Sequence, residues 1–294
     1  MITVLLNPLA GAANTANMPS RLTELFRAAH LPARIMSPAP AEFVVAARAA
    51  ATSGADAVVA AGGDGTVSSV ASVLAGTATP LGVLPIGTLN HFARDLGIPL
   101  DLASAVRVLA ERRVRRVDVG ELNGRTFVNN SSIGVYPDIV VQRDELRRHG
   151  YRKWTAFAIA TLRTIRRYRG VSVWIRTGDS TEKARTPFVF VGNNEYDVDG
   201  IRLGARDRLD AGRLFAYLAP RLRRRELPGL LVLALAGRAR AHQTLESFAA
   251  VELQIDTSRR RRLRVALDGE VALMSTPLHY RVRPRALEVI VPAD

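Results

Sequence analysis

The stretch AAGGDGTVSS (residues 60–69) determines how the first half of this chain is interpreted. It follows the apolar run ADAVVA (55–60) and precedes a helical pattern, so its glycines form a turn between a strand and a helix. Such a turn lets backbone N–H groups approach a phosphate, and the next helix N-terminus adds partial positive charge. Asp64 then places an anion where an anion should bind. Three roles are open for the Asp64 carboxylate. It contacts a phosphate through Mg²⁺, accepts a proton from the group that attacks the phosphate, or only caps the helix.

The residues around this turn alternate between strand and helix patterns. We expect strands at 2–7, 33–37, 56–61 and 81–85, and helices at 20–30, 41–52, 66–75 and 101–112. This rhythm predicts a parallel sheet covered on both faces, with ligands at the carboxyl ends of its strands. The segments NPLAG (7–11), GGDGT (62–66) and PIGTLN (85–90) fall at those ends.

A different pattern begins near Val114. Asn123-Gly124 separates two alternating runs, which is a strong signal for a β-hairpin. Short strands follow, interrupted by helices within 144–169 and 227–238. We predict a first α/β domain over 1–119, completed by 281–294, and an antiparallel β-sandwich with inserted helices over 120–280.

The amino-acid composition indicates which kinds of binding partner the protein favours. The 294 residues carry a formal charge of +14, and all but Lys153 and Lys183 of the 41 basic residues are arginine. Such a chain favours phosphates, yet no nucleic-acid-binding signature accompanies the charge, so we expect no nucleic acid partner. The N-terminus reads as a strand rather than a signal peptide, and the apolar run 227–237 is too short to span a membrane. We expect a cytoplasmic protein.

Six motifs together resemble the diacylglycerol kinase catalytic-domain family, which includes sphingosine, ceramide and bacterial soluble lipid kinases and is distantly related to NAD kinases. They occur in the family's order over nearly the whole chain: NPLAG (7–11), GGDGT (62–66), LPIGTLNHFARDLGIP (84–99), VDVGELNGRTFVNNSSIG (117–134), FVGNN (190–194) and ALDGE (266–270). The resemblance implies a Rossmann-like nucleotide-binding domain, a lipid-binding β-sandwich, and an ATP- and Mg²⁺-dependent lipid kinase.

The resemblance also implies where ATP binds. Its phosphates would lie over the turn formed by Gly62, Gly63, Asp64, Gly65 and Thr66. The flanking positions would be Asn7, Pro8 and Gly11 on one side, Gly87, Thr88 and Asn90 on the other, and Ser37 near the nucleotide. Asp64 would organise the Mg²⁺ that arrives with ATP, and Asp118 could share it.

The lipid hydroxyl must lose a proton as the phosphoryl group arrives, and a carboxylate can accept it. The resemblance places Asp268 and Glu270 at the cleft, one as the base and the other as its support. Asp64 is a further candidate for the base. Taken alone, Asp268-Gly269 could be no more than a hairpin turn.

Three positions depart from the family's pattern. His91 and Ser69 stand where an aspartate and a glutamate are common, and Ala211 stands where relatives have an acid in a second-domain metal site. At the corresponding segment, Arg208 to Arg213, we expect that metal to be absent or weakly bound. His91 and Ala211 keep one alternative open, a catalytically silent lipid- or nucleotide-binding regulator. A second alternative is an NAD-kinase-like enzyme acting on a soluble substrate, because the GGDGT motif is shared with NAD kinases.

The basic segment 144–170 is a candidate membrane contact. A helix from about Tyr151 would gather Trp154, Phe157, Ala158, Thr161, Leu162 and Ile165 on one face, with Arg163, Arg166, Arg167 and Arg169 near its end. This pattern is typical of an interfacial helix, although a core-packed helix with a basic edge gives it too. The arginine runs 221–225 and 259–262 could add attraction. We therefore expect a lipid substrate, a peripheral contact with an anionic membrane surface, and the possibility of a homodimer.

Overall fold

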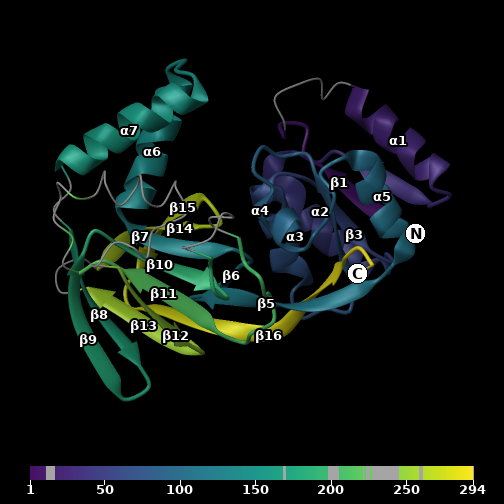
Figure 1. Cartoon of the computed structure of the whole chain (residues 1–294). Coiled ribbons are helices and arrows are strands. Elements are labelled where there is room, and N and C mark those ends of the chain that lie inside the picture. The colour runs from purple at the N-terminus through teal and green to yellow at the C-terminus, as the bar shows by residue number, and fades with distance from the viewer. Residues whose placement is uncertain are drawn as a thin grey trace.

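A computed structural model describes most of the chain (Figure 1). The described residues are 1–10, 17–167, 170–197, 205–220, 222, 226, 245–257 and 261–293. Gly11, Arg169, the helix expected within 227–238 and most of the arginine runs at 221–225 and 259–262 lie outside these ranges.

The first region is a parallel sheet between helices, as the alternating pattern predicts. The strands follow the order β2-β1-β3-β4, and β1, β3 and β4 are completely buried, as expected for strands covered on both faces. The strands are β1 (Ile2–Leu6), β2 (Ala33–Met36), β3 (Val58–Gly62) and β4 (Leu81–Pro85). The helices are α1 (Met18–Ala28), α2 (Phe43–Thr52), α3 (Asp64–Leu74), α4 (His91–Asp95) and α5 (Leu102–Glu111).

The second region is built from antiparallel strands in two layers. One layer is a sheet in the order β12-β11-β10-β7-β14-β15, and the other contains β13, β8 and β9. Residues from both layers share one core, which includes Val173, Val189, Leu214 and Ile255. The strands are β5 (Val114–Leu122), β6 (Arg125–Phe127), β7 (Asn130–Gly134), β8 (Val171–Thr177), β9 (Ser180–Thr186), β10 (Phe188–Asn193), β11 (Leu214–Leu218), β12 (Glu246–Ala250), β13 (Glu252–Thr257), β14 (Arg262–Leu267), β15 (Glu270–Ser275) and β16 (Leu278–Ile290).

The long strand β16 connects the two regions. Its first half pairs with β13, its second half joins β4 through Val289 and Leu81, and β5 runs antiparallel beside it. One sheet therefore extends through both regions, as Figure 1 shows. The predicted hairpin between β5 and β6 is confirmed, because Leu122 pairs with Arg125 and both turn residues have positive φ.

Two helices, α6 (Val135–Arg148) and α7 (Lys153–Arg167), pack together beside the second region (Figure 1). Helix α7 lies within the predicted segment 144–169. Most of α6 was not predicted, because it begins at Val135 directly after β7, and Gly134 before it has φ 100°. On α7 the face towards α6 includes the buried Ala156, Ala160 and Thr164. Among the described residues, no helix is long and apolar enough to cross a membrane.

A buried ion pair joins the two regions. The Arg206 side chain is completely buried, and its Nε donates to Asp95 Oδ2 of α4 at 2.8 Å. Its Nη1 also donates to the carbonyl oxygens of Val128 at 2.7 Å and Asn193 at 2.9 Å. Burial raises the pKa of Asp95, while the Arg206 guanidinium opposes this by favouring the carboxylate. One arginine thus links a first-region helix to two strand ends of the second.

We expect Arg206→Met to lower the free energy of unfolding by about 3–5 kcal/mol, because it leaves the Asp95 carboxylate buried without its charged partner. The matched control is Arg281→Met, which removes an exposed pair with Glu121 and should cost at most about 1 kcal/mol. Urea unfolding of both variants measures the difference. Equal losses would show that Arg206 has no special structural role.

Candidate active site

Three turns at the carboxyl ends of β1, β3 and β4 converge in the first region. Asn7 follows β1, and its Nδ2 donates to Thr66 Oγ1 of α3 at 2.9 Å. Its Oδ1 accepts a hydrogen bond from the Leu9 backbone N–H at 2.9 Å. The turn after β1 is therefore hydrogen-bonded to Thr66 of the GGDGT motif, at the start of α3.

The turns after β3 and β4 touch through their backbones. A Cβ atom on Gly87 would lie 2.4 Å from Gly63 Cα and 2.6 Å from Asn90 Oδ1, so only glycine fits at position 87. Asn90 has φ 51°, and its Nδ2 donates to the Gly87 carbonyl at 2.9 Å. Asn90 Oδ1 is buried and has no hydrogen-bond partner within the described chain. At this pair of turns the backbones of Gly63 and Gly87 touch, and the acceptor Asn90 Oδ1 lies beside them without a hydrogen bond within the described chain.

Asp64 is the first residue of α3, and Gly63 occupies the N-cap position. Gly63 has no side chain that could cap this helix. The Asp64 carboxylate is directed at another helix, because its Oδ1 accepts the Phe92 backbone N–H of α4 at 3.2 Å. The carboxylate therefore lies between the starts of α3 and α4 rather than closing its own helix.

Asp268 connects three segments that are distant in sequence. Its carboxylate accepts hydrogen bonds from the backbone N–H groups of Val128 at 2.8 Å, Asn129 at 2.8 Å and Asn130 at 3.0 Å. Ser68 of α3 adds a hydroxyl donor at 2.5 Å. Burial raises the pKa of Asp268, while these four hydrogen bonds favour its carboxylate form. Asp268 and Gly269 also form the tight turn between β14 and β15, with φ 47° and 89°.

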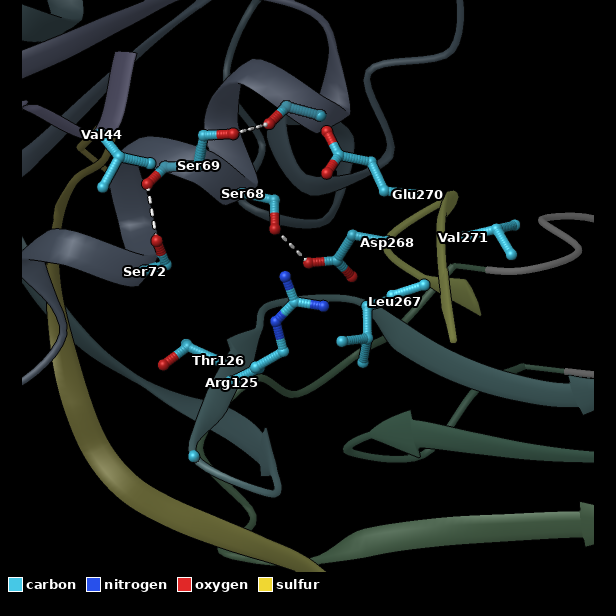
Figure 2. A pocket seen from close by; sticks show the side chains of 13 residues that line it. Val44, Ser68, Ser69, Ser72, Arg125, Thr126, Leu267, Asp268, Glu270 and Val271 are labelled. Atoms are coloured by element: carbon cyan, nitrogen blue, oxygen red, sulfur yellow. Dashed lines mark hydrogen bonds between the residues drawn. The ribbon is translucent and has the colours of Figure 1, made fainter. Parts of the chain in front are cut away.

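Glu270 follows this turn and is exposed. A Cβ atom on Gly65 would lie 3.6 Å from Glu270 Oε1, so the carboxylate stands beside the first turn of α3. Both acids line a cavity of about 360 Å³ between α3, the β5–β6 hairpin and the β14–β15 turn (Figure 2). Its wall is formed by Val44, Gly65, Ser68, Ser69, Ser72, Gly124, Arg125, Thr126, Leu267, Asp268, Glu270, Val271 and Ala272.

Asp118 is completely buried in β5. Its Oδ2 accepts the Gly212 N–H at 2.6 Å and its Oδ1 accepts the Arg285 N–H at 2.8 Å. These bonds hold the 208–213 loop against the irregularity in β16. That Asp118 shares a cation with Asp64 stays a prediction.

The 208–213 segment has its own contacts. Ala211 N–H donates to Asn194 Oδ1 at 2.9 Å, and the carboxylate of Asp210 lies 3.4 Å from Arg208 Nε and 3.7 Å from an Arg115 nitrogen. The carboxylate nearest to Ala211 in sequence is therefore paired with arginines. Arg213 contributes its carbonyl to the Asn194 N–H.

The remaining predicted positions lie around the turns. Pro8, Ser37, Thr88 and His91 are exposed, His91 as the first residue of α4. Ser69 lines the cavity and donates its hydroxyl to the Gly65 carbonyl at 2.9 Å. The described residues contain no group of three or more His, Asp or Glu side chains suited to a metal ion. A single carboxylate such as Asp64 suits an ion whose other ligands are phosphate oxygens and water.

No role in the site was predicted for Ser68, Arg125 or Arg206. Ser68 is the fourth residue after Asp64 and one of several hydroxyl residues of α3, so only its helical spacing from Asp64 could have pointed to it. Arg125 and Arg206 belong to a chain rich in arginine, so composition gave no reason to separate them from surface charges.

Comparisons with known proteins agree with this geometry. Residues 1–122 match the diacylglycerol kinase catalytic domain, and residues 132–291 match the YegS C-terminal NAD kinase beta sandwich-like domain. A Pseudomonas aeruginosa protein named "Probable lipid kinase YegS-like" is 31% identical over 80% of this chain and 76% of its own length. A diacylglycerol kinase of Staphylococcus saprophyticus is 25% identical over 81% of this chain and 78% of its own.

A crystal structure of a Bacillus anthracis diacylglycerol kinase shares the fold, with a TM-score of 0.71 and 20% identity over 99% of this chain and 96% of that one. The fold and the two matched domains define a phosphotransferase of the lipid kinase class. The chain belongs to the diacylglycerol kinase catalytic-domain family, in the branch with a YegS-type C-terminal domain.

We expect no tightly held metal at residues 208–213, because Ala211 supplies no carboxylate and Asp210 is paired with arginines. Metal analysis after dialysis without nucleotide should find well below one ion per chain. The variant Ala211→Asp restores an acid and should retain more Mg²⁺ than the unchanged protein. A stoichiometric ion located at 208–213 in the unchanged protein would contradict this expectation.

Proposed function

We propose that this protein transfers the γ-phosphate of ATP to a hydroxyl group of a lipid at a membrane surface, with Mg²⁺. The observation that carries the proposal is the position of Glu270, which the β14–β15 turn brings beside Gly65 at the start of α3. Gly65 of the glycine-rich turn and a carboxylate that has no ion pair with the described residues thus line one cavity. The names of the relatives, diacylglycerol kinase and lipid kinase, support a lipid as the acceptor.

The first region would hold the nucleotide. Backbone N–H groups at the start of α3 offer donors to phosphate oxygens. Gly63 and Gly87 have no side chains, which lets the two turns lie against each other beside these donors. Asn90 Oδ1, buried without a partner in the described chain, offers an acceptor at the same turns. Mg²⁺, when bound with ATP, would neutralise phosphate charge. Asp64 is the carboxylate best placed to hold that ion through its waters.

Glu270 is the better candidate for the general base of the two acids in LDGE. Asp268 already accepts four hydrogen bonds, which fix its carboxylate to the backbone of 128–130 and to Ser68. Glu270 is exposed and faces the cavity. It would accept the proton of the lipid hydroxyl while that oxygen attacks the γ-phosphorus and the bond to the ADP oxygen breaks. Asp268 would position Glu270 through the turn.

A membrane contact is proposed for the helix pair α6–α7. Trp154 and Leu162 of α7 are exposed to 70% and 51% although they are large and apolar, and Ala158 lies between them on the same helical face. The exposed Arg166 and Arg167 follow at the helix end. An apolar stripe with neighbouring cations suits the interface of an anionic bilayer.

Replacing Glu270 by Gln should lower kcat by about 100- to 10,000-fold, the range expected when a general base is lost, and should leave the KM for ATP nearly unchanged. The measurement is phosphate transfer to lipid in mixed micelles. Glu252→Gln is the matched control, since Glu252 is exposed on β13 and lies outside the cavity. A variant that loses only ATP affinity would move Glu270 to the nucleotide side.

Replacing Trp154 and Leu162 by Ala together should weaken binding to anionic vesicles about tenfold or more, because two large apolar side chains no longer enter the interface. Sedimentation with vesicles at low salt measures this binding, and high salt should release the unchanged protein as screening weakens the arginine attraction. Val251→Ala, at another exposed apolar residue, serves as control. Unchanged binding of the double variant would remove α7 from the membrane contact.

A further inference from the structure

Arg125 is a cationic side chain in the cavity with no ion pair or side-chain hydrogen bond to the described residues. It is the first residue of β6, directly after the tight turn at Asn123 and Gly124. Figure 2 shows its side chain extending from β6 into the cavity, towards Ser68 and Asp268. The hairpin therefore presents a guanidinium to the same space that Glu270 faces.

Several other arginines on nearby strands have carboxylate partners. Arg116 pairs with Glu288 at 2.7 Å, and Arg281 pairs with Glu121 at 2.7 Å. Arg264 pairs with Asp138 at 2.8 Å. Arg125 thus differs from these strand arginines, because its charge is directed into a cavity without being neutralised by an ion pair in the described chain.

Neither acid of the cavity, Asp268 or Glu270, forms an ion pair with Arg125 in the described chain. Asp268 has its carboxylate occupied by three backbone N–H groups and the Ser68 hydroxyl. Glu270 lies beside Gly65 at the start of α3, and no ion pair joins it to Arg125 within the described residues. The guanidinium keeps its donors available for a ligand.

We propose that Arg125 binds an anionic group of the acceptor lipid, so that the enzyme prefers acceptors carrying a phosphate or carboxylate near the reacting hydroxyl. This inference rests on the proposed lipid kinase function. A guanidinium offers a planar fork of N–H donors that matches phosphate or carboxylate oxygens. The serine hydroxyls of α3 and the apolar Leu267, Val271 and Ala272 complete a wall suited to a polar headgroup with an apolar body.

The cavity's wall favours the acceptor over the nucleotide as the ligand of Arg125. Asn7, Gly63, Gly87 and Asn90, which form the turns proposed for ATP, are not among the residues that line it. Only the start of α3 belongs to both places. Arg125 therefore lies on the side from which the acceptor would approach Glu270.

The test uses short-chain lipids below their micelle concentration, which removes the effect of a charged surface. Binding of dihexanoyl phosphatidylglycerol and of the neutral dihexanoylglycerol is measured by calorimetry with ADP present, and phosphate transfer to each is measured with ATP. Arg125→Ala should weaken binding and kcat/KM for the anionic lipid about 10- to 100-fold, the effect of losing a charge-assisted hydrogen-bond pair. The values for the neutral lipid should change less than about twofold.

Two further variants make the result specific. Arg125→Lys should recover part of the loss, since it keeps the charge without the planar fork. Arg21→Ala removes one exposed arginine on α1, outside the cavity, and should match the unchanged protein with both lipids.

The outcomes separate the inference from the function on which it rests. Equal losses for both lipids, or a lower kcat with every acceptor, would place Arg125 at the transferred phosphate and overturn the inference. A preference of the unchanged protein for the neutral lipid would also overturn it. Binding of the anionic lipid that depends on Arg125, without any phosphate transfer by the unchanged protein, would refute the kinase proposal and leave the binding site standing.

Discussion

The hydrogen bonds to the Asp268 carboxylate determine the geometry of the whole site. One side chain of the β14–β15 turn accepts three backbone N–H groups from 128–130 and the hydroxyl of Ser68. Ser68 belongs to α3, whose first turn carries the GGDGT motif. The carboxylate therefore connects the antiparallel region to the helix that would hold the phosphates. Glu270, two residues later, reaches Gly65 because of this connection.

Other contacts also fix the position of the two regions relative to each other. Strand β16 belongs to both halves of the large sheet, and Arg206 joins Asp95 to the carbonyl groups at 128 and 193. The segment 128–130 consequently meets both Arg206 and Asp268. Breaking the interface would move the acids of LDGE away from α3. The proposed phosphate transfer therefore depends on the contacts that hold the two regions together where the reacting groups would meet.

The sequence was sufficient to predict the parallel region and the hairpin at Asn123-Gly124, because these follow from local patterns: period, turn residues and apolar runs. The family resemblance also predicted that the GGDGT and LDGE motifs lie at one cleft. It could not distinguish Asp268 from Glu270, since their difference arises from partners 138 to 200 residues away. The same holds for Arg206 and Arg125. Only the tertiary surroundings show that Arg206 forms a buried pair, whereas Arg125 has no ion pair within the described part of the chain.

The position of Glu270 at the glycine-rich turn is the main support for the proposal that phosphate passes from ATP to a lipid. The most direct test is to incubate the unchanged protein with γ-labelled ATP, Mg²⁺ and a mixed panel of lipid acceptors, together with NAD as a soluble acceptor, and then to separate the organic phase. The proposed reaction predicts label in a phospholipid product, in a one-to-one ratio with the ADP formed. Label in NADP, or the absence of any labelled lipid, would contradict it.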